Sequence, residues 1–264
     1  MMRSIVFIFL FFVANIVYSQ NQVKAFQAGE KLVFTASYNM SGLLTDLAQV
    51  TMETSEVKTS KNTLWRLKCT ATTFSKWDSF FKIRDLYESY VNPRTLVPYL
   101  YKREIDEGGH YKFVKYNFNH RSNTVKSLRR QKSKNFESGF WDRNSEVKIN
   151  SGTNDIVTTI YHIRNLDIHK ASIGSTDTFT VLFDNKETKI NLTLLAIETI
   201  STKIGKKECY KLAISINNSD LLKGKNNNLL WLTADDNKIP VHAKFKIAVG
   251  SGELNIKSAT GLKN

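Results

Sequence analysis

The alternation of apolar and polar residues is the feature that most constrains the fold of this chain. Side chains of a β-strand point to opposite faces in turn, so a half-buried strand shows a period of two. Leu32, Phe34 and Ala36 alternate in this way with polar neighbours. The pattern recurs in short segments that are separated by turn residues such as Asn92-Pro93 and Gly108-Gly109. The chain is therefore predicted to be mainly β.

The number of expected strands limits how they can be arranged. They cover residues 29–38, 49–57, 64–74, 80–91, 98–105, 110–118, 124–130, 178–183, 188–197, 199–203, 208–216, 229–233, 241–249 and 253–259. Short turns between consecutive strands are typical of an antiparallel meander. A twisted sheet of this size has to curl, split or close. We predict a large curved antiparallel meander sheet, or an open β-barrel or sandwich.

One segment breaks the period of two. Residues 154–167 show a helical apolar stripe that consists of Ile156, Ile160, Ile163 and Leu166. Thr153 or Asn154 can cap the start of this helix, with Asp155 in its first turn. We predict a single helix of about three turns that covers one face or mouth of the sheet.

The N-terminus has the three parts of a secretory signal. Arg3 gives a positive start, residues 4–17 are mostly apolar, and Val17 and Ser19 precede a cut before Gln20. The apolar run is shorter than the roughly 20 residues of a spanning helix. We predict cleavage near Ser19/Gln20 and an exported mature chain, periplasmic or extracellular, that is not transmembrane. Residues 20–28 are expected to be a loose leader, and 29–264 a single domain.

The chain is strongly basic, with a formal net charge of +14. An exported protein rarely meets nucleic acid, so nucleic acid is not expected as a partner. The densest basic run consists of Lys126, Arg129, Arg130, Lys132 and Lys134. We interpret it as a solvated hairpin tip and edge, since lysine on an edge strand discourages aggregation. Contact with an anionic surface is the alternative.

The sequence does not nominate a catalytic residue, a metal ligand or a cofactor site. The five histidines do not form a ligand pair, and phosphate-binding or nucleophile motifs are missing. Cys69 and Cys209 are the two cysteines, and their strand patterns place them on different faces. We therefore expect that they do not form a disulfide.

Charged and aromatic residues on two neighbouring expected strands form the best candidate site. Arg84, Glu88 and Arg103 are expected to meet as cross-strand ion pairs, each worth less than about 1 kcal/mol. The structural interpretation is that these pairs only support the sheet. The functional interpretation is a ligand patch inside the concave sheet, formed by Arg84, Glu88, Tyr90, Tyr101, Arg103 and Trp141. Trp141 lies in a weakly patterned stretch, 134–151, which we interpret as a lid or partner-binding loop.

An ordered set of segments resembles a bacterial exported family, domain of unknown function 3108. The matching segments include residues 29–32, 80–90, 93–98, 107–109, 154–156, 161–164, 202–205, Cys209, 231–233 and 239–241. The resemblance covers most of the mature chain and implies a mainly β protein of the cell envelope. It does not imply an activity.

Three functions follow as hypotheses. The first is a non-enzymatic envelope protein that binds an amphipathic molecule, a glycan or a protein partner. The second is a hydrolase that acts on envelope polymers through two carboxylates not evident in the sequence. The third is a structural or assembly factor that uses the basic hairpin.

Overall fold

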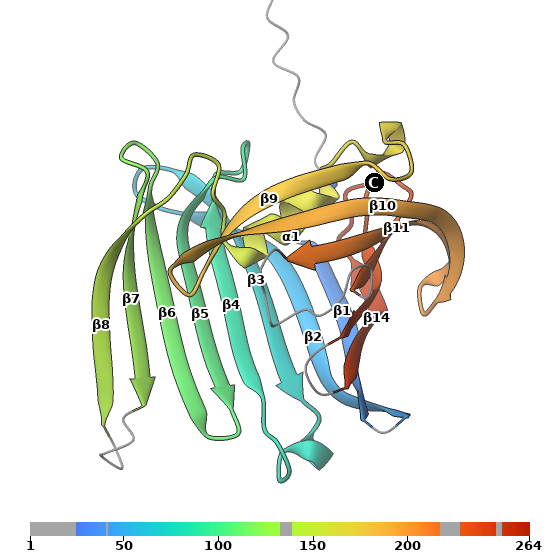
Figure 1. Ribbon diagram of the computed structural model, residues 1–264, viewed down its shortest axis with the longest axis horizontal. Coiled ribbons are helices and arrows are strands. Elements are labelled where there is room, and N and C mark those ends of the chain that lie inside the picture. Colours follow the sequence, from blue (N-terminus) through green and yellow to red (C-terminus); the bar gives the residue numbers. More distant parts are fainter. Residues whose placement is uncertain (1–24, 41, 133–138, 217–227, 247–249) are drawn as a thin grey trace, which may run out of the picture.

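A single antiparallel sheet dominates the structure (Figure 1). The computed structural model describes residues 25–40, 42–132, 139–216, 228–246 and 250–264; the predicted signal sequence and Lys134 lie outside them. Within these ranges the strands are β1 Lys31–Met40, β2 Leu43–Lys58, β3 Thr63–Thr73, β4 Arg84–Val91, β5 Pro98–Glu107, β6 His110–Asn119, β7 Thr124–Lys132, β8 Phe140–Lys148, β9 Thr176–Phe183, β10 Lys186–Thr202, β11 Gly205–Ile216, β12 Leu229–Thr233, β13 Pro240–Lys246 and β14 Ser251–Thr260. The prediction of a large antiparallel sheet is confirmed.

The strand order consists of two meanders joined at the chain ends. β1 to β8 are neighbours in sequence order, β14 pairs with the free side of β1, and β13 to β9 continue from there. β8 and β9 are therefore the two edges of the sheet within the described residues. The sheet curls strongly, so that β9 and β10 lie across the concave side of β1–β8 (Figure 1).

The turn between β9 and β10 connects the two halves of the curled sheet. Asp184 and Asn185 form this turn with positive φ angles of 47° and 64°, as a tight hairpin requires. The Asn185 side chain accepts a hydrogen bond from Ser127 on β7 (2.8 Å), and its backbone N–H donates to the Tyr116 hydroxyl on β6 (3.0 Å). An edge hairpin is thus held against the opposite half of the sheet.

In the part of the chain that the structure describes, one α-helix, α1 Ile156–Arg164, fills the space inside the curl. Its side chains Val157 and Tyr161 are almost completely buried, so they belong to the core of the sheet. The helix was predicted, but its cap is Asp155, whose carboxylate accepts from the Thr158 N–H (2.8 Å). The same carboxylate accepts from Ser89 on β4 (2.6 Å), which fixes the start of the helix on the sheet.

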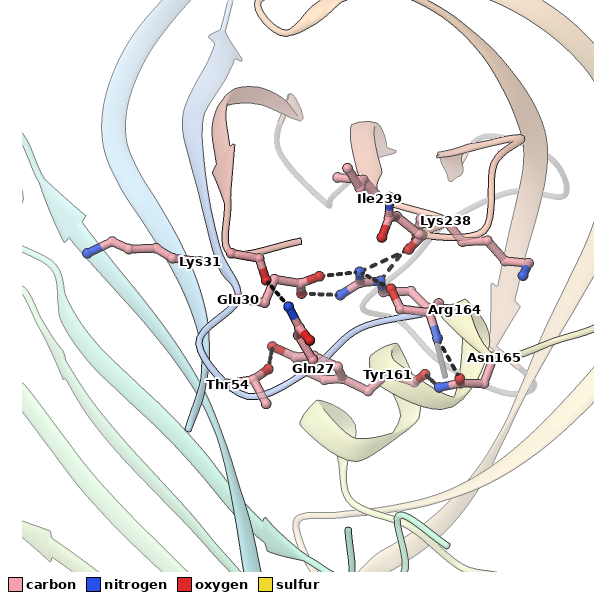
Figure 2. Close-up of polar contacts among 12 residues, drawn as sticks. Gln27, Glu30, Lys31, Thr54, Tyr161, Arg164, Asn165, Lys238 and Ile239 are labelled. Carbon is pink, nitrogen blue, oxygen red and sulfur yellow. Dashed lines mark hydrogen bonds and ion pairs between the residues drawn. The ribbon is translucent and has the colours of Figure 1, made fainter. Parts of the chain in front are cut away.

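Arg164 at the end of α1 makes a buried ion pair with Glu30 (Figure 2). The two guanidinium Nη atoms lie 2.6 Å and 2.8 Å from the two carboxylate oxygens of Glu30. Arg164 also donates to the backbone carbonyls of Ala25, Asn237 and Lys238. Because both charged groups are fully buried, this pair joins the N-terminal segment, the helix and the β12–β13 turn.

The first described residues belong to the core, so the expectation of a loose leader is wrong there. Ala25 and Phe26 are buried, and the Phe26 ring packs edge-on against Tyr161 with 4.6 Å between centroids. The Ala25 N–H donates to the Asn165 side chain (3.0 Å). The segment lies inside the curl, where α1 covers it.

Strands β8 and β10 differ from the sequence prediction, whereas the two cysteines agree with it. Residues 140–148 form edge strand β8 rather than a loop, although their side chains are mostly exposed. β10 is one long strand that ends at Thr202, because no turn separates residues 188–197 from the segment that follows them. Cys69 and Cys209 are free thiols, as expected. Among the described residues, none of the helices is long and apolar enough to span a membrane.

Candidate functional site

The register of β4 and β5 separates the residues of the predicted patch. Ser89 contacts the helix, so its face of the sheet is here called the inner face, and the opposite one the outer face. Tyr101 pairs with Ser89 and therefore lies on the inner face together with Arg103. Trp141 shares this face through the continuous register of β5 to β8.

The other three residues of the patch, Arg84, Glu88 and Tyr90, lie on the outer face. Arg84 pairs with Asp78 at 2.5 Å, and Glu88 accepts from Arg66 Nε at 2.7 Å. The expectation that Arg84, Glu88 and Arg103 meet is therefore wrong, because alternation sends neighbouring positions to opposite faces.

Arg103 instead takes part in a charge cluster on the inner face. Its guanidinium pairs with Asp184 at the tip of the β9–β10 hairpin, and Lys112 Nζ lies 2.9 Å from the same carboxylate. Arg129 is a third cation, at 3.8 Å. Burial acts to raise the pKa of Asp184, but the hydrogen bonds from Lys112 and Arg103 outweigh it and lower this pKa. The cluster is a contact between the halves of the sheet.

The predicted basic surface is also divided by alternation. Arg129 points inward, whereas Lys126, Arg130 and Lys132 lie on the outer face of β7. Arg130 pairs there with Asp142 at 2.7 Å. The basic run was expected at a sheet edge. This expectation is wrong for β7, because β8 pairs with it and forms the edge.

A groove of about 1110 Å³ opens on the outer face. It lies where the far end of the β10–β11 hairpin bends over β12, β13, β14 and β1. Trp231 of β12 belongs to its floor, since Leu230 and Leu232 on either side point to the inner face, where they pack in a cluster with Ile163 of α1. The lining includes Lys203, Lys211, Lys244 and Lys257, and polar groups of Thr35, Ser201, Thr202, His242 and Asn255.

Hydrogen bonds fix the floor of the groove. Trp231 Nε1 donates to Glu198 (2.7 Å), and this bond is the main reason why the pKa of Glu198 is lowered. His242 packs on the Trp231 ring with 4.7 Å between centroids, and its Nδ1 lies 3.1 Å from the Leu254 carbonyl. The floor is thus rigid and partly apolar.

The rim of the groove carries an excess of positive charge. Lys211 pairs with Glu198 at 3.3 Å, and Lys244 with Glu253 at 3.2 Å. Lys203 and Lys257 are exposed and do not pair with an acid among the described residues. Asp46, the acid in the lining, accepts a hydrogen bond from Ser37. Two lysines are therefore available to bind an anion.

A pair of carboxyl groups, Asp85 on β4 and Glu107 at the end of β5, lies on the inner face, whereas the groove lies on the outer face. Asp85 on β4 is 6% exposed and accepts from the Asp106 N–H (3.2 Å). Burial, followed by the charge of Glu107, raises the pKa of Asp85 to about 7. The nearby negative charge of Glu107 therefore adds to the effect of burial on Asp85.

Neither the groove residues nor this carboxyl pair was predicted from the sequence. Alternation does place Lys211, His242 and Lys244 on the face away from the core, which is the available signal. It does not show that β10 bends over them, because the bend depends on pairing between distant strands.

The chain matches the protein family of unknown function DUF3108 over residues 33–257. It belongs to this family. The resemblance to this family that the sequence segments indicated is therefore confirmed. A comparison of this DUF3108 member with curated proteins found no match.

Two solved structures are similar to this family member. One is a β-barrel-like protein of DUF1849 from Brucella abortus, with a TM-score of 0.56 and 9% identity over 90% of this chain and 100% of that chain. It shares the fold. The other is a predicted exported protein with a YmcC-like fold from Bacteroides fragilis, with a TM-score of 0.30 and 10% identity, over 89% of this chain and 96% of that chain.

Proposed function

We propose that this chain is an exported, non-enzymatic binding protein of the cell envelope whose groove holds an anionic glycan. The observation that carries the proposal is the set of four lysines around a groove with a rigid floor of Trp231 and His242. A volume of about 1110 Å³ suits a ligand of several sugar units.

The chemistry of the lining supports a glycan in particular. Lys203 and Lys257 can pair with carboxylate, sulfate or phosphate groups of the ligand, since they do not have acidic partners in the described structure. Thr35, Ser201, Thr202 and Asn255 can exchange hydrogen bonds with sugar hydroxyls. The predicted secretory signal supports a ligand that occurs outside the cytoplasm.

Calorimetric titration with matched oligosaccharides tests this function. We expect binding of a carboxylated or sulfated oligosaccharide and much weaker binding of its neutral counterpart. The double variant Lys203→Ala/Lys257→Ala should bind the anionic oligosaccharide roughly tenfold more weakly, since each exposed ion pair contributes up to about 1 kcal/mol. Added salt should weaken binding because the rim charges are exposed.

A matched control removes two lysines elsewhere. Lys58→Ala/Lys61→Ala changes the net charge by the same amount at the β2–β3 turn and should not affect binding. Equal loss in both double variants would show a non-specific charge effect. Binding of a fatty acid in place of the oligosaccharide would contradict the glycan and indicate an amphipathic ligand.

A further inference from the structure

Exposed apolar side chains gather at one end of the sheet. Of the nine large hydrophobic residues that are exposed in the described structure, six lie there: Leu43, Leu44, Phe80, Phe81, Phe140 and Trp141. This loop end carries the β1–β2 turn, the β3–β4 loop, the β5–β6 turn and the start of β8, which lie together at the bottom of Figure 1. Such clustering marks an interaction surface rather than scattered surface residues.

The β3–β4 loop holds its aromatic residues in fixed positions. Trp77 Nε1 donates to the Asp46 carbonyl on β2 (2.8 Å), which ties this loop to its neighbour. Asp78 accepts from Thr73 (2.6 Å) and pairs with Arg84 (2.5 Å), which closes the base of the loop. The loop is therefore anchored at both ends.

The two phenylalanines of this loop, Phe80 and Phe81, differ in their surroundings. The Phe81 ring covers the β5–β6 turn so closely that a Cβ on Gly108 would lie 2.8 Å from it. Phe80 is 82% exposed. A large apolar ring held in water on an anchored loop is unfavourable for the isolated protein, and a partner that buries this ring would remove the cost.

The charges of the β3–β4 loop, in contrast to the β5–β6 turn with its acids Asp106 and Glu107, favour an anionic partner. The β3–β4 loop and the residue after it carry Lys76, Lys82 and Arg84 against a single acid, Asp78, which is already paired with Arg84. At the start of β8, Asp142 is paired with Arg130. Aromatic rings beside free lysines are the combination that proteins place at the boundary between lipid headgroups and acyl chains.

We propose that the loop end docks on the surface of an anionic lipid bilayer. Phe80, Phe81 and Leu43 enter the boundary of the acyl chains, while Lys76 and Lys82 remain at the headgroups. A second copy of this chain would present the same positive charge and is disfavoured for that reason. The proposal does not depend on the ligand of the groove.

Flotation of the full mature protein with lipid vesicles tests the docking. We expect binding to vesicles of phosphatidylcholine with phosphatidylglycerol, and weak binding to phosphatidylcholine alone. Phe80→Ser should weaken binding roughly tenfold or more, from the loss of about 1.5–3 kcal/mol of apolar burial. Lys76→Glu/Lys82→Glu should reduce binding to the anionic vesicles only.

Two controls keep the result specific. Ile173→Ser removes another exposed side chain (69%) away from the loop end and should not change vesicle binding. Lys203→Ala/Lys257→Ala should also leave it unchanged, which separates this proposal from that of the groove. The proposal fails if the unmodified protein does not float with anionic vesicles, or if Phe80→Ser binds equally well. A dimer in ultracentrifugation that Phe80→Ser abolishes would likewise overturn it.

Discussion

At the scale of single residues, buried charge is the most informative feature of this protein. Arg164 and Glu30 are both inaccessible to solvent, yet the guanidinium donates to a carboxylate and three carbonyls. Burying two charges is costly, and complete hydrogen bonding is what makes such a pair tolerable. The pair therefore specifies how the N-terminal segment, α1 and the β12–β13 turn fit together.

Removal of one partner should be strongly destabilising. We expect Arg164→Met to lower the free energy of unfolding by about 3–5 kcal/mol, because Glu30 is left buried and uncompensated. Urea denaturation followed by circular dichroism measures this. The double variant Arg164→Met/Glu30→Met should recover part of the loss. A single-variant loss below about 1 kcal/mol, as for a surface pair, would contradict the role of Arg164.

Asp85 makes the stability dependent on pH. Its folded pKa is raised to about 7, whereas an unfolded aspartate titrates near 3.9. Between pH about 4 and 7 the folded state keeps a proton that the unfolded state has lost, so stability falls as pH rises. We expect Asp85→Asn to reduce this fall between pH 5 and pH 8 in urea denaturation. Asp177→Asn, an exposed site on β9, should leave the pH profile unchanged.

At the scale of elements, the sequence predicts best those strands that bury one face. Leu32 and Phe34 of β1 alternate clearly, and their strand was predicted. β8 was missed, because its side chains from Phe140 to Lys148 are mostly exposed and an edge strand of this kind does not need an apolar face. The helix was predicted from Ile160 and its neighbours, but α1 lies inside the curl and buries Val157, Tyr161 and Arg164 as well.

The start of α1 illustrates how one residue fixes an element. Asp155 caps the helix and also accepts from the Ser89 hydroxyl on β4. We expect Asp155→Ala to lower the free energy of unfolding by about 2 kcal/mol or more, from the lost cap and a buried hydroxyl without its acceptor. Ser89→Ala keeps the cap and should cost less. An equal loss in the two variants, measured by thermal or urea unfolding, would show that the cap itself contributes little.

At the scale of the whole molecule, the two candidate surfaces arise in different ways. The loop end collects the β1–β2, β3–β4 and β5–β6 connections, because alternate connections of the meander β1–β8 lie at the same end of the sheet. The groove forms where the β10–β11 hairpin bends over β12–β14, and it depends on the pairing of β1 with β14, which joins residues at opposite ends of the chain. Strand alternation does not encode such a pairing. The sequence could therefore predict a curved sheet, but not the groove that contains Lys203.

The tip of the β9–β10 hairpin is the contact that should hold the curl closed. Asp184 neutralises the buried side chain of Arg103, which is 2% exposed. The Asp184 side chain is 39% exposed, so the ion pair is only partly buried. We therefore expect Asp184→Ala to cost about 1–3 kcal/mol, less than the loss of a fully buried pair. Hydrogen exchange should accelerate in β9 and at the start of β10, since β9 is an edge strand with one neighbour.

The pattern of exchange distinguishes a local latch from a general loss of stability. Amides of α1 and β2 should keep their protection in Asp184→Ala, because Asp155 and Arg164 hold the helix independently of the tip. Asp177→Ala removes an exposed carboxylate from the same hairpin and should not change exchange in β9. Uniform acceleration over all strands would mean that the tip stabilises the molecule as a whole. The groove, formed by β10–β14 and β1, should still bind its anionic ligand when the tip is released, because the contacts of Asp184 lie on the inner face of β5–β7.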